Sequence, residues 1–190
     1  ANSPVHSSIP ETDAIKANLS ALKNGNIPVI AIPQLVREPN FFSDAAAFFS
    51  LIRILRHERP GIVHTHTSKA GFLGRWAAWL CRIPIIVHTP HGHVFWGYFG
   101  RLKTRLFVLL ERWTARITTR LVMLTERDKA DHMRFRIAPA EKFTVIHSGV
   151  DLARFRPNPA RAGATRTALE IPVEAIVVAT VGRLTAVKGQ

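Results

Sequence analysis

Residues 62–71 read IVHTHTSKAG and residues 85–92 read IIVHTPHG. Each stretch opens with the apolar, β-branched residues of a buried strand and passes directly into polar residues and a glycine. Strands of a parallel sheet end in this way, and ligands bind such sheets beyond the carboxyl ends of the strands. The two stretches therefore indicate a parallel sheet and mark the residues to examine for chemistry.

Outward from these stretches, short apolar segments alternate with segments of helical periodicity. Strands are predicted at residues 28–32, 62–65, 85–88, 121–124, 143–146 and 175–181. Helices are predicted at residues 11–23, 44–56, 68–81, 101–118 and 126–135, with a short one before Pro172. Asp44 is expected to cap the second of these helices. The alternation predicts an α/β fold, a Rossmann-like parallel sheet with helices on both faces.

Residues 156–163 contain two prolines and a glycine, which is typical of a linker. We therefore expect residues 1–155 to form one Rossmann-like domain. Residues 156–172 would be a linker with a short helix, and residues 173–190 the start of a second domain.

The composition, with 47% hydrophobic and 21% charged residues among 190, predicts a globular core and excludes disordered and collagen-like classes. The single cysteine, Cys81, can form no internal disulfide and fits a reducing compartment. No apolar run is long enough to span a bilayer, and the polar start lacks the pattern of a signal peptide. The net charge of +13 favours a polyanionic partner: nucleic acid, an acidic membrane or a phosphorylated substrate.

Two histidine clusters leave alternatives open. Strand alternation places His64 and His66 on one side of their strand, and a second cluster comprises His88, His91 and His93. A metal-dependent hydrolase could use His64, His66, His91 and His93, although no acidic ligand follows either cluster. We favour His64 and His88 as hydrogen-bonded residues of the sheet. A basic nucleic-acid-binding domain is the other alternative, but no RNA-recognition motif is present.

Three further residues follow predicted strands. His91 lies beside Gly92, which lets the backbone approach a ligand, so its imidazole can bond a hydroxyl-rich substrate. Arg183 and Lys188 follow the last predicted strand and a glycine turn. The planar guanidinium and the point charge of the ammonium are suited to a diphosphate.

Four motifs, in this order, resemble glycosyltransferase family 4: HTHTSKAG at 64–71, HTPHG at 88–92, VIHSGVD at 145–151 and GRLTAVKG at 182–189. The resemblance covers nearly the whole chain and is nearest to bacterial members that build exopolysaccharides and lipid-linked oligosaccharides. Such enzymes have the GT-B fold, with two Rossmann-like domains, and transfer a sugar from a nucleotide-sugar donor with retention. The resemblance further implies a chain truncated at both ends, without the family's first strand and most of its donor domain.

The resemblance assigns roles to several residues. His91 is implied to be the catalytic histidine that contacts the transferred sugar, and Arg183 and Lys188 the pair that binds the donor diphosphate. Gly149 and Asp151 match the segment that joins the domains, where Ser148 replaces the usual asparagine. The candidates for the sugar and acceptor side are His66, Ser68, Lys69 and Gly92. No metal or cofactor is expected, because the departing diphosphate itself helps to deprotonate the acceptor.

The segment 94–120 suggests a peripheral position on the cytoplasmic face of the membrane. Its loop contains four aromatic residues: Phe95, Trp96, Tyr98 and Phe99. In the next helix, four arginines fall within an arc of about 60°: Arg101, Arg105, Arg112 and Arg116. An adjoining apolar arc, expected to pack on the sheet, comprises Leu102, Leu106, Leu109, Leu110, Trp113 and Ile117. We expect the aromatic loop and the arginines to dock on an anionic membrane that presents a lipid-diphosphate acceptor.

Overall fold

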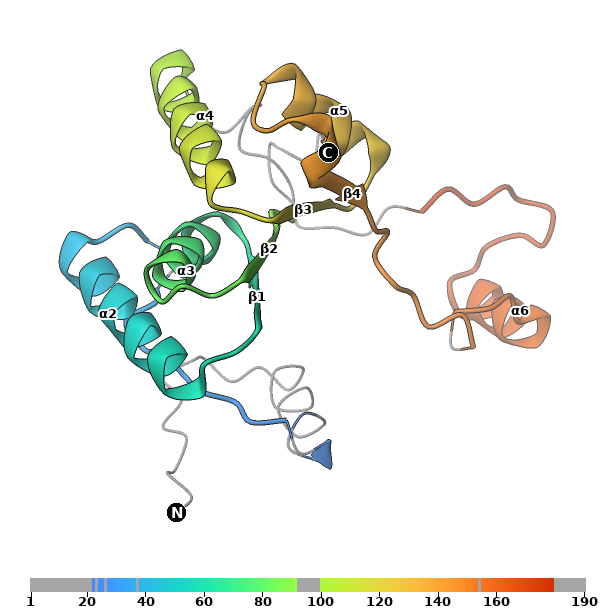
Figure 1. Ribbon diagram of the computed structural model, residues 1–190. Coiled ribbons are helices and arrows are strands. Elements are labelled where there is room, and N and C mark those ends of the chain that lie inside the picture. The colour runs from blue at the N-terminus through green and yellow to red at the C-terminus, as the bar shows by residue number, and fades with distance from the viewer. Residues whose placement is uncertain are drawn as a thin grey trace.

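A parallel sheet forms the centre of the computed structural model, which describes residues 22, 24–25, 27–36, 38–91, 100–153 and 155–179 (Figure 1). The sheet order is β1-β2-β3-β4, and all neighbouring pairs are parallel. The strands are β1 (Ile62–His66), β2 (Ile85–Thr89), β3 (Arg120–Met123) and β4 (Phe143–Val145). These strands confirm four of the six predicted strands to within about two residues.

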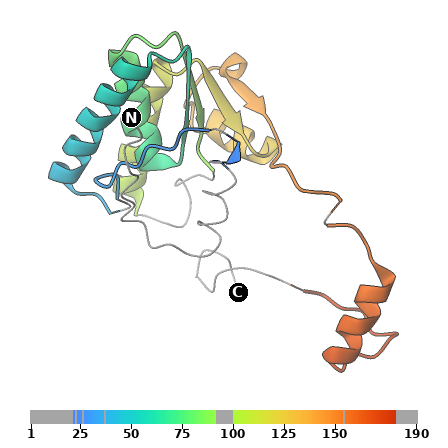
Figure 2. The same ribbon diagram turned by 90° about the horizontal axis from the view of Figure 1, so that it is seen from below.

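Helices connect the strands as the sequence predicts. They are α2 (Phe41–Glu58), α3 (Ser68–Leu80), α4 (Arg101–Arg116) and α5 (Glu126–Arg134), with a short 3₁₀ helix, η1 (Ala140–Lys142), before β4. The last helix, α6 (Pro159–Ala168), stands apart from the sheet (Figure 2). The α/β, Rossmann-like class is thereby confirmed.

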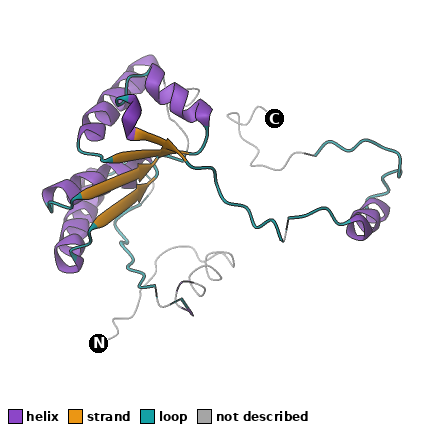
Figure 3. Ribbon diagram, turned by 45° about the vertical axis from the view of Figure 1, so that its right-hand side comes forward, coloured by secondary structure: helices purple, strands orange, loops and turns teal. Residues whose placement is uncertain are grey.

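Helices α2 to α5 lie on one face of the sheet (Figure 3). Helix α3 lies directly against the face that carries His88 and Thr65. A Cβ atom added to Gly71 would lie 2.2 Å from His88 Cε1, and one added to Gly74 would lie 2.8 Å from Thr65 Cγ2. The ring of His132, in α5, packs against Phe143, which the strand register places on that same face. Each connection steps to the next strand in one direction, and right-handed crossovers then put their helices on one side. Within the described residues, the prediction of helices on both faces therefore holds for one face only.

The start of α2 differs from the prediction. Asn40, not Asp44, is the N-cap, and its Oδ1 accepts a hydrogen bond from Ser43 N at 3.0 Å. The Asp44 carboxylate lies in the first turn and accepts from Asn40 N at 3.2 Å. The two side chains thus satisfy backbone donors reciprocally, as in a capping box.

Two predicted strands are not formed in the described residues. Residues 27–32 join no ladder, and the chain turns directly after them, with Leu35 N donating to Ile32 O at 3.0 Å. Pro28 lies within this run and Pro33 directly follows it, and neither offers a backbone donor. Residues 175–179 are also without strand structure, and residues 180–181 lie outside the description. The predicted domain boundary stays a prediction, although α6 begins inside the expected linker.

Helix α4 is rotated relative to the expectation. Four apolar residues expected to pack on the sheet are exposed: Leu102, Leu106, Leu109 and Trp113. The inward face carries the buried Val108 and Ala115 together with two polar residues, the partly buried Glu111 and the buried Thr114, both of which are hydrogen-bonded. Glu111 binds Arg75, and Thr114 Oγ1 donates to Leu110 O at 2.8 Å. The predicted packing is therefore wrong for these four residues, whereas Leu110 and Ile117 are half-buried.

Candidate functional site

Three histidines and a threonine gather where β1 and β2 end. His66 Nδ1 lies 2.8 Å from His91 Nε2, and His64 Nε2 lies 2.8 Å from Thr89 Oγ1. The ring of His66 stacks between the other two, with centroids 4.2 Å from His64 and 5.0 Å from His91. His64 and His66 lie on one side of their strand, as predicted, and this side is opposite to that of Thr65, which packs against α3. The structure thus unites two site candidates, His66 and His91, across neighbouring strands.

The cluster disfavours positive charge at its centre. Desolvation lowers the pKa of His66, and the neighbouring rings of His64 and His91 lower this pKa further. His66 is therefore neutral at physiological pH, with one ring nitrogen donating and the other accepting. Through this hydrogen bond, His66 can orient the ring of His91 toward a ligand.

The backbone is strained at two points beside the cluster. Thr67 has φ 63° and ψ 172°, a region that is essentially restricted to glycine. His91 has φ 54°, in the left-handed region. A hydrogen bond of 3.2 Å from Thr67 N to Thr89 O ties the two strand ends together. Such strain concentrates at functional sites, and Thr67 is a residue that the sequence patterns missed.

A metal centre is not favoured by this arrangement. The bond between His66 and His91 uses one nitrogen of each ring, and Thr89 holds a nitrogen of His64. Among the described residues, no group of three or more histidine, cysteine, aspartate or glutamate side chains is arranged to hold a metal ion. The fourth proposed ligand, His93, lies outside the described residues.

The other candidates are dispersed or undescribed. Lys69 points toward α2, where its ammonium donates to Glu38 O at 2.7 Å and pairs with Asp44. Ser68 is exposed at the start of α3, and Gly149 is exposed after β4. The Asp151 carboxylate accepts from Ala153 N at 3.0 Å. Predicted site residues outside the described residues are Gly92, Phe95, Trp96, Tyr98, Phe99, Arg183 and Lys188.

Buried polar residues lie on the opposite face of β1 and β2, against α3. His88 is fully buried, and its Nδ1 lies 2.9 Å from Thr65 Oγ1. Burial, followed by the positive charge of Arg75, lowers the pKa of His88 to about 3, so the ring is neutral. The expectation of a hydrogen-bonded sheet histidine is confirmed for His88, and His64 has a similar bond to Thr89.

Arg75 and Glu111 form an ion pair close enough to His88 to act on its charge. Arg75 is fully buried and donates two hydrogen bonds of 2.8 Å to the two carboxylate oxygens of Glu111. Its Nε donates to Gly71 O at 3.0 Å. Burial opposes the charge of Glu111, but the hydrogen bonds and charge of Arg75 lower its pKa below the usual value. Two sequence signals could have revealed the pair: Arg75 is the lone cation among small and apolar residues, and Glu111 is the lone acid of a basic helix.

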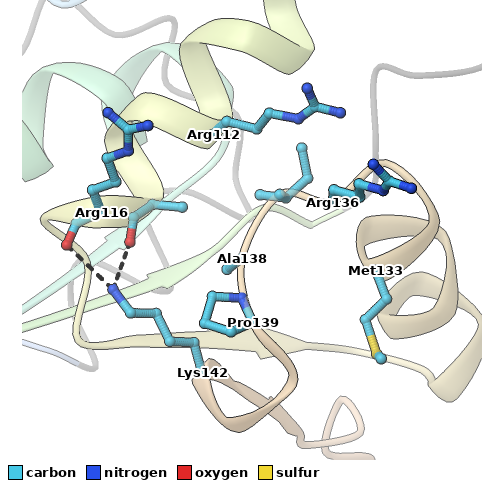
Figure 4. A pocket seen from close by; sticks show the side chains of 9 residues that line it. Arg112, Arg116, Met133, Arg136, Ala138, Pro139 and Lys142 are labelled. Carbon is cyan, nitrogen blue, oxygen red and sulfur yellow. Dashed lines mark hydrogen bonds between the residues drawn. The ribbon is translucent and has the colours of Figure 1, made fainter.

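A separate hollow of about 600 Å³ lies at the opposite edge of the sheet (Figure 4). Its walls come from the ends of α4 and α5 and from the segment before β4. The cationic residues that line it are Arg112, Arg116, Arg136 and Lys142. Lys142 Nζ donates to Ala115 O at 2.8 Å and to Thr118 O at 2.7 Å, which satisfies carbonyls at the end of α4. This hollow contains none of the clustered histidines.

Known proteins show similarity over most of the chain. A model of Glycosyltransferase Family 4 matches residues 9–154. The Escherichia coli UDP-Gal:alpha-D-GlcNAc-diphosphoundecaprenol alpha-1,3-galactosyltransferase is 35% identical over 153 residues, which are 80% of this chain and 40% of that protein. The capsular polysaccharide biosynthesis glycosyltransferase CapM of Staphylococcus aureus is 27% identical over 128 residues, 67% of this chain and 33% of CapM. The chain therefore spans less than half the length of these relatives.

Among solved structures, Anabaena Alr3699/HepE in complex with UDP superposes with a TM-score of 0.60 at 19% identity. The match covers 81% of this chain and 40% of that one, and supports the Rossmann-like fold. The family match, the identity to the E. coli enzyme and this fold agree. The chain belongs to glycosyltransferase family 4.

Proposed function

We propose that the whole protein carrying this chain is a retaining hexosyltransferase of cell-envelope polysaccharide synthesis. It moves a sugar from a nucleotide-sugar donor to a lipid-linked or saccharide acceptor. Family membership supports the transfer, and the E. coli relative is itself named for a diphosphoundecaprenol-linked acceptor. The observation that carries the proposal is the His66–His91 hydrogen bond at the carboxyl edge of the sheet, where ligands bind in such folds.

In this mechanism, His91 positions the sugar. His66 holds one nitrogen of the His91 ring, which leaves Nδ1 of His91 to bond a sugar hydroxyl. Because the pKa of His66 is lowered, its ring keeps one donating and one accepting nitrogen at physiological pH. Sugar transfer with retention then proceeds on the face of the leaving group, whose diphosphate accepts the acceptor proton. The protein mainly orients the substrates.

Arg183 and Lys188 neutralise the departing diphosphate. A charged hydrogen bond contributes about 1.5–3 kcal/mol, equivalent to roughly 10- to 100-fold in rate for each residue. The whole enzyme needs no metal or other cofactor in this scheme. It works in the cytoplasm at the inner face of the membrane and binds no nucleic acid.

The test is transfer by the whole protein from a panel of labelled nucleotide hexoses to polyprenyl-diphosphate N-acetylglucosamine. The expected product has the same anomeric configuration as the donor, which NMR of the product determines. An inverted product would contradict the retaining mechanism. Absence of transfer to every lipid-linked and saccharide acceptor would contradict the proposal as a whole.

A further inference from the structure

An exposed apolar row runs along α4. The relative exposures are 81% for Leu102, 55% for Leu106, 61% for Leu109 and 52% for Trp113. Spacings of four, three and four residues align these side chains on one side of the helix. The row continues onto α3, because the rings of Trp113 and Trp76 lie 4.6 Å apart and Trp79, itself half exposed, lies 5.5 Å from Trp76. Contiguous apolar surface of this kind marks an interaction site.

Arginines flank this row, and within the described residues no ion pair is formed by Arg101, Arg105 or Arg116. Arg101, Arg105 and Arg116 are exposed on the adjoining arc, while Arg112 is fixed by hydrogen bonds of 2.9 and 2.7 Å to Phe135 O. The only acid of α4, Glu111, faces inward. Arg75 occupies both of its carboxylate oxygens. The outer surface of α4 is therefore cationic along one side and apolar along the other.

The hollow lined by Arg112, Arg116, Arg136 and Lys142, here called the basic hollow, continues this surface. Arg112 and Arg116 belong both to the arginine row and to the hollow, and Arg136 lies opposite them (Figure 4). None of the residues that line the hollow is acidic. Guanidinium groups, as planar donors of several hydrogen bonds, are suited to the phosphate of a lipid headgroup.

We infer that the outer surface of α4 and the adjoining hollow bind an anionic lipid bilayer. This docking surface comprises the apolar row, the arginine row beside it and the basic hollow. Leu102, Leu106, Leu109 and Trp113 enter the boundary between headgroups and acyl chains, and the arginines bind lipid phosphates. A second copy of the chain fits less well, because a two-fold interface would bring like arginine rows together. A nucleic acid would contact the arginines but leave the apolar row in water.

The orientation of α4 relates this surface to the site. The helix follows β2 in the chain, so its first turn lies at the carboxyl edge of the sheet, the edge of the histidine cluster. A bilayer lying along α4 therefore reaches the edge at which His91 would meet a lipid-linked acceptor. This functional connection rests on the proposed transfer reaction, whereas the docking itself does not.

The first experiment measures partition of the 190-residue chain onto phosphatidylcholine vesicles with and without phosphatidylglycerol. We expect binding at low salt to the anionic vesicles. Each basic residue near an anionic surface contributes about fivefold, so R105Q/R116Q should weaken partition roughly 30-fold. The control, R53Q/R56Q, removes two exposed arginines from α2 and should change partition much less.

The second experiment tests the apolar row with L102S/L106S/L109S. Quenching of tryptophan fluorescence by brominated lipid should fall, while the control F41S/F42S/F49S, three exposed residues of α2, should be quenched like the parent chain. Absence of binding to anionic vesicles, or equal binding and quenching by both triple variants, would overturn the inference. Conversion of a dimer to a monomer by the leucine substitutions, with vesicle binding unchanged, would identify a second copy as the occupant instead. Vesicle binding needs no sugar donor, so failed transfer and failed docking are distinguishable.

Discussion

The ring of His66 holds that of His91 across two neighbouring strands, with 2.8 Å between Nδ1 of His66 and Nε2 of His91. The contact depends on the parallel register, which pairs His66 with Thr89 and so brings the end of β1 beside the segment after β2. It also depends on the left-handed backbone of His91, at φ 54°. His91 is therefore held by its neighbour and by its backbone before any substrate binds.

We predict that His91→Asn in the whole protein lowers kcat/KM for transfer about tenfold, the equivalent of roughly one hydrogen bond. Asparagine accepts a left-handed backbone, so the substitution removes the imidazole with little added strain. Steady-state kinetics and circular dichroism measure the two effects. Full activity in a correctly folded variant would show that His91 makes no contact with the sugar.

A companion variant, His66→Gln, tests the positioning role of His66. Glutamine can bond His91 but cannot titrate. The pKa of His66 lies below its ordinary value of 6.5, so acid should reduce parent activity only below that range. In His66→Gln, the loss of activity that protonation of His66 causes at acid pH should disappear from the pH profile. An unchanged profile would mean that another group causes the fall in activity at acid pH.

Arg183→Ala and Lys188→Ala should each raise the KM for the nucleotide-sugar donor more than the KM for the acceptor. The reason is that both cations follow a predicted strand and are proposed to bind the donor diphosphate. Initial rates with each substrate varied in turn separate the two effects. Equal losses for donor and acceptor would contradict that role.

The sequence predicted the sheet well because buried parallel strands have strong local signals, as in IVHTH and IIVHT. It also placed His64 and His66 on one side, since strand alternation is a local rule. The rotation of α4 was not predictable from its periodicity, because its inward face mixes the apolar Val108 and Ala115 with the polar Glu111 and Thr114. That face depends on Arg75, which lies 36 residues away in the sequence. The contact between His66 and His91 likewise depends on register and on backbone strain, which are tertiary properties.

Stability should depend on pH through His88. Its pKa is about 3 in the folded chain and about 6.5 when unfolded, so between these values the unfolded chain binds the extra proton. The free energy of unfolding should therefore rise with pH across this window, by up to about 1.4 kcal/mol per pH unit from this residue. Its contribution is complete above pH 6.5 and is lost as pH falls toward 3. Urea unfolding at several pH values measures the slope.

A variant in which His88 is replaced by asparagine should lose this part of the slope, although it is less stable at neutral pH. The matched control is His57→Asn, because His57 is an exposed histidine on α2 and should leave the slope unchanged. A slope that persists in the His88 variant would mean that carboxylates, such as Glu111, dominate the acid sensitivity.

The pair of Arg75 and Glu111 should make a large contribution to stability when either partner is removed alone. Arg75 is fully buried, so Glu111→Ala leaves a guanidinium without its counter-ion and should cost about 3–5 kcal/mol in the free energy of unfolding. The control Glu174→Ala removes an exposed carboxylate and should cost much less. The double variant R75M/E111L replaces the pair with apolar side chains and should recover most of the loss, because no charge is then left buried. Denaturant unfolding of the four chains measures these differences. A double variant as unstable as Glu111→Ala would show that the pair is needed for the packing of α3 on α4, and not only for compensation of the buried charge.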